Sequence, residues 1–334
     1  MKVLILTDGK AGHENQSKAF ARALGCEYDL VEVHFKSKFA KAASYLLDRM
    51  GIRSLSLLKS DDPAIRQSDN SYGAVIGTGS GTFYAAKAMA RKLGVKCGVV
   101  LYPRGYRIST FDCILAPAFD RPATGPNVIE IPANLVANDE AFYAKGVAAF
   151  RERYGEGQQA DDNKAAEQTR VGDDNKRSAV AVIVGGPNKC STMTPEWMKS
   201  QLDRIFSSSL LPQTSSLKPL FWVTTSRRTP PEVEAVVDSY PWDYRLIYSK
   251  DHFNPIPAFV KLAKKLYVTA ESTGMLSEAC TFGTAEVVAL DNLNPGPHKF
   301  RRFVEDLRTG GYVDGNRKVD LSAQFAKAKT LMGL

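Results

Sequence analysis

Residues 268–280 (VTAESTGMLSEAC) place hydroxyl and carboxylate groups directly after a short apolar run. The run 265–269 predicts a strand, and the chain from Ser272 onward predicts a helix. Such a strand–turn–helix junction presents free backbone N–H groups and a partial positive charge, which commonly hold phosphate. Glu278, early in the helix, cannot bind phosphate but can accept hydrogen bonds from hydroxyls. The pattern indicates either a nucleotide site or an ordinary αβ unit with an acid near the helix start.

Three more loops of the second half carry polar groups near predicted strands. The apolar run 179–184 precedes Gly-Gly-Pro-Asn at 185–188, and the run 220–225 precedes Ser-Arg-Arg-Thr-Pro-Pro at 226–231. Planar guanidinium groups suit phosphate. Residues 298–303 (HKFRRF) again combine cations with aromatic rings. Each loop alone is an ordinary turn or a solvated charge cluster, but four such loops in one half favour a ligand site.

In the first half, two glycine-containing loops follow apolar runs. Residues 8–16 read DGKAGHENQ, and His13 lies where the next helix is expected to begin. An imidazole there could act as a general base or donate a hydrogen bond to a substrate, although a lone loop histidine is often incidental. Residues 77–82 (GTGSGT) offer a polar anion cradle. A dinucleotide-binding dehydrogenase is disfavoured, because this loop lacks the full fingerprint and its acidic partner.

The length of 334 residues suggests about two domains, because single cores seldom exceed roughly 250–300 residues. The five cysteines are far apart and form no CxxC pair, which argues against a zinc site or a disulfide framework and fits a reducing compartment. The first residues lack the apolar run of a signal peptide, and no segment approaches the roughly 18 apolar residues of a membrane span. We therefore expect a cytoplasmic protein.

The formal net charge of +8 indicates a basic surface, which attracts nucleic acid, anionic lipid or phosphorylated substrates. In residues 34–59, six lysines and arginines accompany a single acid, Asp48. The same stretch has apolar residues at helical spacing, namely Phe39, Ala43, Leu46, Leu47 and Met50. This stripe either packs on the core beneath solvated lysines, the commoner arrangement, or docks on an anionic membrane surface.

Apolar runs alternate with helical patterns, which predicts two doubly wound α/β domains with parallel strands. The expected strands are residues 3–7, 28–33, 74–77, 97–101 and 113–115 in the first half and 179–184, 220–225, 245–247, 266–269 and 286–290 in the second. Residues 155–176 have almost no apolar content, which predicts an exposed linker or disordered insertion. The expected divisions are an N-terminal domain over 1–150, the linker over 151–178, a C-terminal domain over 179–318 and a final helix over 319–334 that could pack on either domain.

The motifs, taken in order, resemble those of the mitochondrial fission ELM family. They are LTDGKAGHENQSKAFARAL, GGP, TTSRRTPP, VTAESTGMLSEAC followed by FGT, and HKFRRF, and the resemblance spans nearly the whole chain except the linker. That family is similar to MurG-type GT-B glycosyltransferases, in which two Rossmann-like domains flank a cleft. In these enzymes a glycine-rich first loop ending in His faces the acceptor. A GG loop, a Ser/Arg loop and a Ser…Glu helix hold the nucleotide-sugar.

The resemblance implies roles for individual residues. His13 corresponds to the acceptor-side histidine and is the expected catalytic base, with Asp8 and Glu14 as alternatives, and Glu278 corresponds to the ribose-binding carboxylate. The expected donor-binding residues are Gly185, Gly186, Asn188, Ser226, Arg227, Arg228, Thr229, Glu271, Ser272, Thr273, Met275, Ser277, Glu278 and Lys299. The expected acceptor-side residues are Gly9, Gly12, Gln16, Gly79, Ser80 and Arg104. Family members usually read GAGRRTH where residues 77–83 read GTGSGTF, so acceptor handling there differs or is weakened.

The function implied by the resemblance is an inverting glycosyltransferase that moves a sugar from a nucleotide-sugar to an envelope glycan or lipid-linked acceptor. Backbone N–H dipoles and arginine would stabilise the departing diphosphate without a metal, and no DxD motif occurs. No cofactor and no nucleic acid partner are expected. The basic stretch would hold the enzyme on the anionic inner face of a membrane. The alternatives are a non-catalytic peripheral membrane adaptor of the ELM type and a nucleotide-sugar epimerase with the same architecture.

Overall fold

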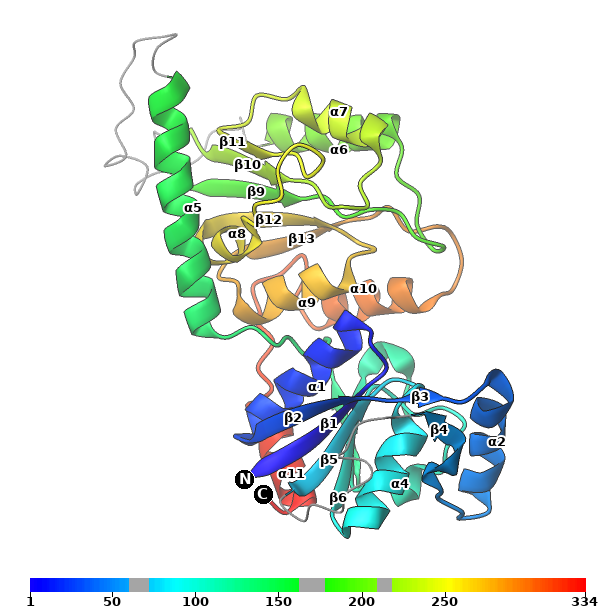
Figure 1. Cartoon of the computed structure of the whole chain (residues 1–334). Helices are drawn as coiled ribbons and strands as arrows, with labels where there is room; N and C mark the ends of the chain where they lie inside the picture. Colours follow the sequence, from blue (N-terminus) through cyan, green and yellow to red (C-terminus); the bar gives the residue numbers. More distant parts are fainter. Residues whose placement is uncertain (60–71, 162–177, 209–217) are drawn as a thin grey trace. The chain divides into compact units, whose positions relative to one another are not determined.

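The computed structural model describes residues 1–59, 72–161, 178–208 and 218–334 (Figure 1). The chain divides into two compact units, the first made of Met1–Ala137 and Asp320–Leu334 and the second of Asn138–Val319. Each unit is built on a parallel β-sheet with helices packed against it. The predicted α/β class with two doubly wound, Rossmann-like domains is therefore confirmed. The predicted cleft between them stays a prediction.

The first unit contains a six-stranded sheet in the order β2-β1-β5-β6-β7-β8 and a small antiparallel hairpin, β3–β4. The strands are β1 (Lys2–Thr7), β2 (Glu27–Glu32), β3 (His34–Phe35), β4 (Leu58–Lys59), β5 (Tyr72–Thr78), β6 (Lys96–Val100), β7 (Cys113–Pro117) and β8 (Val128–Ile131). The helices are α1 (Ala11–Leu24), α2 (Lys38–Arg49), α4 (Phe83–Leu93) and α11 (Ser322–Met332), with short 3-10 turns at Leu55–Leu57, Ile108–Thr110 and Ala118–Asp120. Because helices cover the sheet, its central strands are almost wholly apolar.

The second unit contains a five-stranded sheet in the order β11-β10-β9-β12-β13. Its strands are β9 (Ala179–Ile183), β10 (Leu220–Thr224), β11 (Tyr244–Leu246), β12 (Ala263–Thr269) and β13 (Glu286–Leu290). Its helices are α5 (Glu140–Asp161), α6 (Pro195–Ser208), α7 (Pro231–Asp238), α8 (Ile256–Leu262), α9 (Thr273–Phe282) and α10 (Lys299–Thr309). Since β9 is central and parallel to its neighbours, the loops that follow β9, β10 and β12 leave the sheet at the same edge.

The division between the units falls at Ala137, earlier than the predicted residue 150. The reason is α5, whose Phe150 is 1% exposed and packs on Trp222 and Phe259 of the second unit at centroid distances of 5.1 and 5.8 Å. α5 also runs to Asp161, so a helix occupies the start of the predicted linker. Residues 162–177 of that linker lie outside the described residues.

The final helix, α11, packs on the first unit, although more than 180 residues separate the two in sequence (Figure 1). A side chain added at Gly98 of β6 would meet both Met332 of α11 and Phe20 of α1 at 3.0 Å. The missing side chain therefore lets two helices approach the sheet. This settles the placement of the last helix, which the sequence left open.

The apolar stripe predicted for α2 packs on the core only in part, through Leu47. Phe39, Leu46 and Met50 are 87%, 62% and 64% exposed, whereas Ser44 and Asp48 are fully buried. The expectation that this stripe covers the core is wrong for these three residues. The inward side of the helix is formed instead by Ser44 and Asp48 together with the partly buried Tyr45 and Leu47.

Candidate active site

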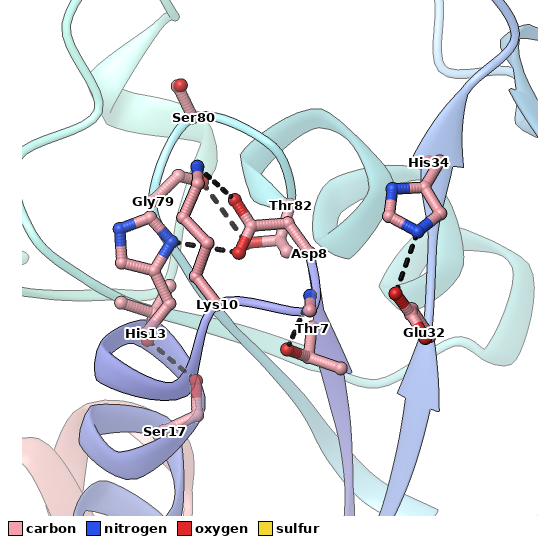
Figure 2. A network of polar contacts seen from close by, with 12 residues as sticks. Thr7, Asp8, Lys10, His13, Ser17, Glu32, His34, Gly79, Ser80 and Thr82 are labelled. Carbon is pink, nitrogen blue, oxygen red and sulfur yellow. Dashed lines mark hydrogen bonds and ion pairs between the residues drawn. The ribbon is translucent and has the colours of Figure 1, made fainter.

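An aspartate–histidine pair lies at the carboxyl end of β1 (Figure 2). Asp8 Oδ1 is 2.9 Å from His13 Nδ1, and Asp8 Oδ2 is 2.9 Å from Lys10 Nζ. Burial acts to raise the pKa of Asp8, but hydrogen bonds from Lys10 and His13 outweigh it and hold the pKa below its ordinary value. The carboxylate can therefore only accept hydrogen bonds at neutral pH, so a neutral His13 carries its proton on Nδ1. Its Nε2, without a hydrogen-bond partner among the described residues, can then accept a proton.

The loop after β5 packs directly against this pair. Gly79 has a φ of +81°, and a side chain there would lie 2.4 Å from Cε1 of His13. A side chain at Gly81 would lie 2.7 Å from Cβ of Asp8. Only glycine permits both this conformation and this close approach. The glycine pattern of residues 77–82, which suggested an anion cradle, thus has a direct packing reason.

The other predicted site residues of the first unit each contact a different group. Ser80 Oγ accepts a hydrogen bond from Lys41 Nζ of α2 at 2.9 Å. Gly9 has a φ of +78° and lies against the carboxylate of Glu32, whereas Gly12 faces open space. The carboxylate of Glu14 pairs with Lys18 one turn along α1 at 2.6 Å.

Two further residues complete this set. Gln16 Oε1 is buried and has no hydrogen-bond partner among the described residues. Arg104 donates to the Asp120 carbonyl and lies over the Tyr102 ring, so its guanidinium is already engaged.

In the second unit, the loops after β9 and β10 are joined by hydrogen bonds. Thr229 Oγ1 donates to the Gly185 carbonyl at 2.6 Å, and its hydroxyl also accepts from the backbone N–H of Ser226 at 2.9 Å. A side chain at Gly186 would lie 2.2 Å from the Arg228 carbonyl oxygen. The two loops therefore contact each other at a position that only glycine allows.

Glu271, after β12, fixes the same glycine pair from the other side. Its Oε1 accepts from the Gly186 N–H at 2.8 Å, and its Oε2 accepts from Asn292 Nδ2 at 2.7 Å. The residue is 2% exposed, and burial raises the pKa of its carboxyl group. A side chain at Gly185 would lie 2.0 Å from the same carboxylate. Glu271 therefore holds the loops in place.

The start of α9 is the open part of this edge. Its N-cap residue, Ser272, makes no side-chain capping bond, and a side chain at Gly274 would meet nothing within 4 Å. Thr273 and Met275 are half-buried in the same turn. Ser277 is fully buried, and its hydroxyl donates to the Thr273 carbonyl at 2.7 Å, so it is not available to a ligand.

Glu278, on the next turn of α9, is held by residues from α5 and the segment before it. Its Oε1 accepts from Tyr143 OH at 2.9 Å and from Asn138 Nδ2 at 3.3 Å. Burial raises the pKa of Glu278 although both hydrogen bonds oppose it. Its Oε2 has no hydrogen-bond partner in the described part of the chain. Tyr143 in turn stacks on Phe282 with a centroid distance of 5.0 Å, which fixes the hydroxyl in position.

The predicted cationic residues of the donor site are exposed and differ in their contacts. Arg227 and Arg228 are exposed and form no ion pair with any described residue. Lys299 is also exposed, and its ammonium group lies over the Phe300 ring. Asn188 Oδ1 accepts from the Cys190 N–H at 2.8 Å and thus shapes its own turn. Lys189, in the loop after β9, is exposed as well, so it and the two arginines are the cations of these loops that remain available to an anion.

The described residues show neither a metal-binding cluster nor a membrane-spanning helix. Outside the three gaps, no group of three or more histidine, cysteine or acidic side chains is arranged to hold a metal ion. Within the same residues, no helix is both long enough and apolar enough to cross a membrane.

The sequence matches the family described as mitochondrial fission ELM1 over residues 11–327. The chain belongs to this family. The ELM1 match confirms the resemblance that the motifs indicated. No curated protein sequence matches the chain significantly.

Several solved structures are similar to this ELM1 family member at low identity. A putative UDP-N-acetylglucosamine 2-epimerase from Listeria monocytogenes is 10% identical, with a TM-score of 0.48, covering 100% of this chain and 88% of the other. The UDP-GlcNAc 2-epimerase from Neisseria meningitidis bound to UDP-GlcNAc is 12% identical, with a TM-score of 0.46 and coverage of 100% and 98%. A UDP-glucosyltransferase from Polygonum tinctorium is 9% identical, with a TM-score of 0.46 and coverage of 99% and 89%.

The tertiary structure adds residues that sequence reasoning missed. Tyr143 and Asn138 reach Glu278 across at least 135 positions, Asn292 binds Glu271, and Lys41 binds Ser80. Lys41 belongs to the basic stretch of residues 34–59, and the other three lie in no recognisable motif. Only the hydrogen bond between Asp8 and His13, five residues apart, could have been inferred from their proximity in one loop.

Proposed function

We propose that this protein is an inverting glycosyltransferase that uses a nucleotide-sugar donor and needs neither a metal nor another cofactor. The observation that carries the proposal is the Asp8–His13 pair, which leaves Nε2 of a partly exposed imidazole unpartnered among the described residues. Family membership and the loops at the edge of the second sheet support the donor part.

In the proposed reaction, His13 Nε2 removes the proton from an acceptor hydroxyl as its oxygen attacks the anomeric carbon of the sugar. The bond from that carbon to the diphosphate oxygen breaks on the opposite face, so the configuration inverts. The proton ends on His13, and the ionised Asp8 stabilises the imidazolium formed. The nucleotide diphosphate leaves with the electron pair of the broken bond.

For the donor, we propose that Arg227 and Arg228 bind the diphosphate together with the open first turn of α9. Glu278 Oε2 would accept hydrogen bonds from the ribose hydroxyls, since Oε1 is already occupied by Tyr143 and Asn138. Glu271 would act as a positioning residue that keeps the glycine pair in place.

A thermal-shift screen with UDP-, GDP-, ADP- and CMP-sugars tests the donor site. We expect one of these classes to raise the melting temperature, and the variant Glu278→Gln to remove most of that rise. Glu232→Gln, at an exposed glutamate of α7, is the matched control. Stabilisation by none of the four classes would exclude the transferase proposal and favour the adaptor alternative.

Catalysis is tested separately with the donor that binds. His13→Ala should retain donor binding and lower the rate of sugar transfer or donor hydrolysis by roughly 10²–10⁴-fold, the usual contribution of a general base. His34→Ala is the matched control, because His34 forms a similar pair with Glu32 at 2.8 Å on the surface (Figure 2). Equal rates for His13→Ala and the unmodified protein would refute the assigned base. Conversion of the donor to its epimer without transfer would support the epimerase alternative.

A further inference from the structure

The helix α2 and its C-cap residue present three large apolar side chains to solvent. Phe39, Leu46 and Met50 are 87%, 62% and 64% exposed, and their spacing of seven and four residues places them on one side of the helix. Ile52, which follows the helix, is also exposed, with 43% of its surface accessible. Large apolar side chains that gather on one surface mark an interaction site more often than scattered ones do.

Polar bonds on the opposite side hold α2 in this orientation. Asp48 Oδ1 pairs with Lys87 Nζ of α4 at 2.7 Å, and Asp48 Oδ2 accepts from the Arg107 N–H at 2.7 Å. Ser44 hydroxyl lies 2.9 Å from Tyr106 OH. Rotating the helix to bury the apolar stripe would expose or unpair these groups, and an unpaired buried charge is strongly unfavourable. The apolar side therefore faces outward as a consequence of the fold.

The charge around this stripe is positive. Between residues 34 and 59 the sequence has six lysines and arginines and one acid, Asp48. That acid is buried against Lys87, so it does not offset the surface cations. Lys36, Lys38 and Arg49 are exposed and form no ion pair with any described residue. A second copy of this chain would bring the same cations opposite one another, which disfavours self-association through this face.

We propose that α2 docks on an anionic lipid bilayer, with Phe39, Leu46 and Met50 inserted at the boundary between headgroups and acyl chains. Lys36, Lys38 and Arg49 then contact the lipid phosphates. An apolar stripe bordered by cations is the arrangement that lies in the plane of an anionic membrane surface. This docking does not depend on the proposed enzymatic activity.

One contact links the docking helix to the candidate site. Lys41 of α2 donates to Ser80 at 2.9 Å, and Ser80 lies between Gly79 and Gly81, which pack against His13 and Asp8. Docking would therefore hold the loop around His13 close to the lipid surface. This extension rests on the proposed function, and it favours a lipid-linked acceptor over a soluble glycan.

Vesicle sedimentation tests the docking. The full chain should bind vesicles of mixed phosphatidylglycerol and phosphatidylcholine and bind pure phosphatidylcholine vesicles much more weakly. The triple variant Phe39→Ser, Leu46→Ser, Met50→Ser should lose binding, by roughly tenfold for each side chain removed. The matched control is Leu30→Ser, Phe142→Ser, whose targets are 38% and 40% exposed elsewhere. Unchanged melting temperatures establish that the variants are folded.

The charge contribution is measured with a second set of variants. Lys38→Gln, Arg49→Gln should weaken binding by about fivefold for each cation removed, whereas Lys327→Gln, Lys329→Gln on α11 should have little effect. Equal binding of both vesicle types, or retained binding by the folded triple variant, would overturn the proposal. So would an absence of vesicle binding combined with dimers that the triple variant dissociates, since the stripe would then join two copies. Vesicle binding requires no donor, so its failure is distinguishable from failure of the proposed function.

Discussion

The substitution Lys87→Met tests how much the buried ion pair between α4 and α2 stabilises the first unit. The side chains of Lys87 and Asp48 are both 0% exposed, and their charged atoms are 2.7 Å apart. Lys87 also donates to the Arg107 carbonyl and lies 4.0 Å from the centre of the Phe111 ring. Methionine retains much of the volume but leaves the carboxylate of Asp48 without its counter-charge.

The expected cost follows from the burial of the pair. Removing one partner of a buried ion pair destabilises a protein by about 3–5 kcal/mol, because the other charge stays desolvated. Burial lowers the pKa of Lys87, although the hydrogen bond and the charge of Asp48 oppose it. The double variant Asp48→Asn, Lys87→Met should recover part of the loss, since no buried charge remains.

The matched control is Lys96→Met. Lys96 pairs with Asp112 at 2.8 Å in the same unit, but the two side chains are 51% and 31% exposed. Exposed pairs contribute about 0.2–1 kcal/mol. The two substitutions remove the same chemical group from similar distances, so the difference between them measures burial.

Urea unfolding followed by circular dichroism and tryptophan fluorescence provides the assay. All three tryptophans, Trp197, Trp222 and Trp242, lie in the second unit, so tryptophan fluorescence follows that unit. Circular dichroism follows both units, and a change seen only in circular dichroism reports on the first. A loss of about 3 kcal/mol should move the circular dichroism midpoint down by about 1–2 M urea. A shift for Lys87→Met no larger than that for Lys96→Met would refute the reasoning, as would a double variant less stable than Lys87→Met.

Three further substitutions test the candidate site. Gly79→Ala should displace the imidazole of His13 and lower activity at least roughly tenfold in a transfer assay. Gly125→Ala, whose added side chain would meet its nearest atoms at 3.4 Å, should leave activity unchanged. The melting temperature of Glu271→Gln should rise relative to that of the unmodified protein as the pH increases from about 4.5. Burial raises the pKa of Glu271, so the folded unmodified protein loses stability over the pH range in which this group ionises. A difference in melting temperature that does not change with pH would contradict this. Asp8→Asn should be less stable than the unmodified protein at neutral pH, and the difference should shrink as pH falls below 3.8, because the lowered pKa of Asp8 contributes stability only where the group is ionised. Parallel melting curves across that range would show that the Asp8 carboxylate is not held as described.

The sequence by itself determined the strands and the edge where the candidate site lies. Continuous apolar runs such as residues 113–115 and 179–184 predicted buried parallel strands, and all ten predicted strands are present. The strand β8 and the hairpin β3–β4 were missed, because none of them is a continuous apolar run: Glu130 interrupts β8, and β3 and β4 each pair one apolar with one polar residue. The loops with glycine and polar residues after these strands were also identified, since topology alone places them at the carboxyl edge.

Only the tertiary structure decided which side chains meet and which way an element faces. Glu271 and Glu278 are seven residues apart in one motif, yet one fastens the glycine pair and the other keeps an oxygen unpartnered among the described residues. The helical periodicity of α2 was predicted correctly. Which side of the helix faces the core depends on the ion pair between Asp48 and Lys87, which are 39 residues apart in the sequence. A sequence pattern records which residues share a face. The cost of leaving a buried charge unpaired determines which face turns inward.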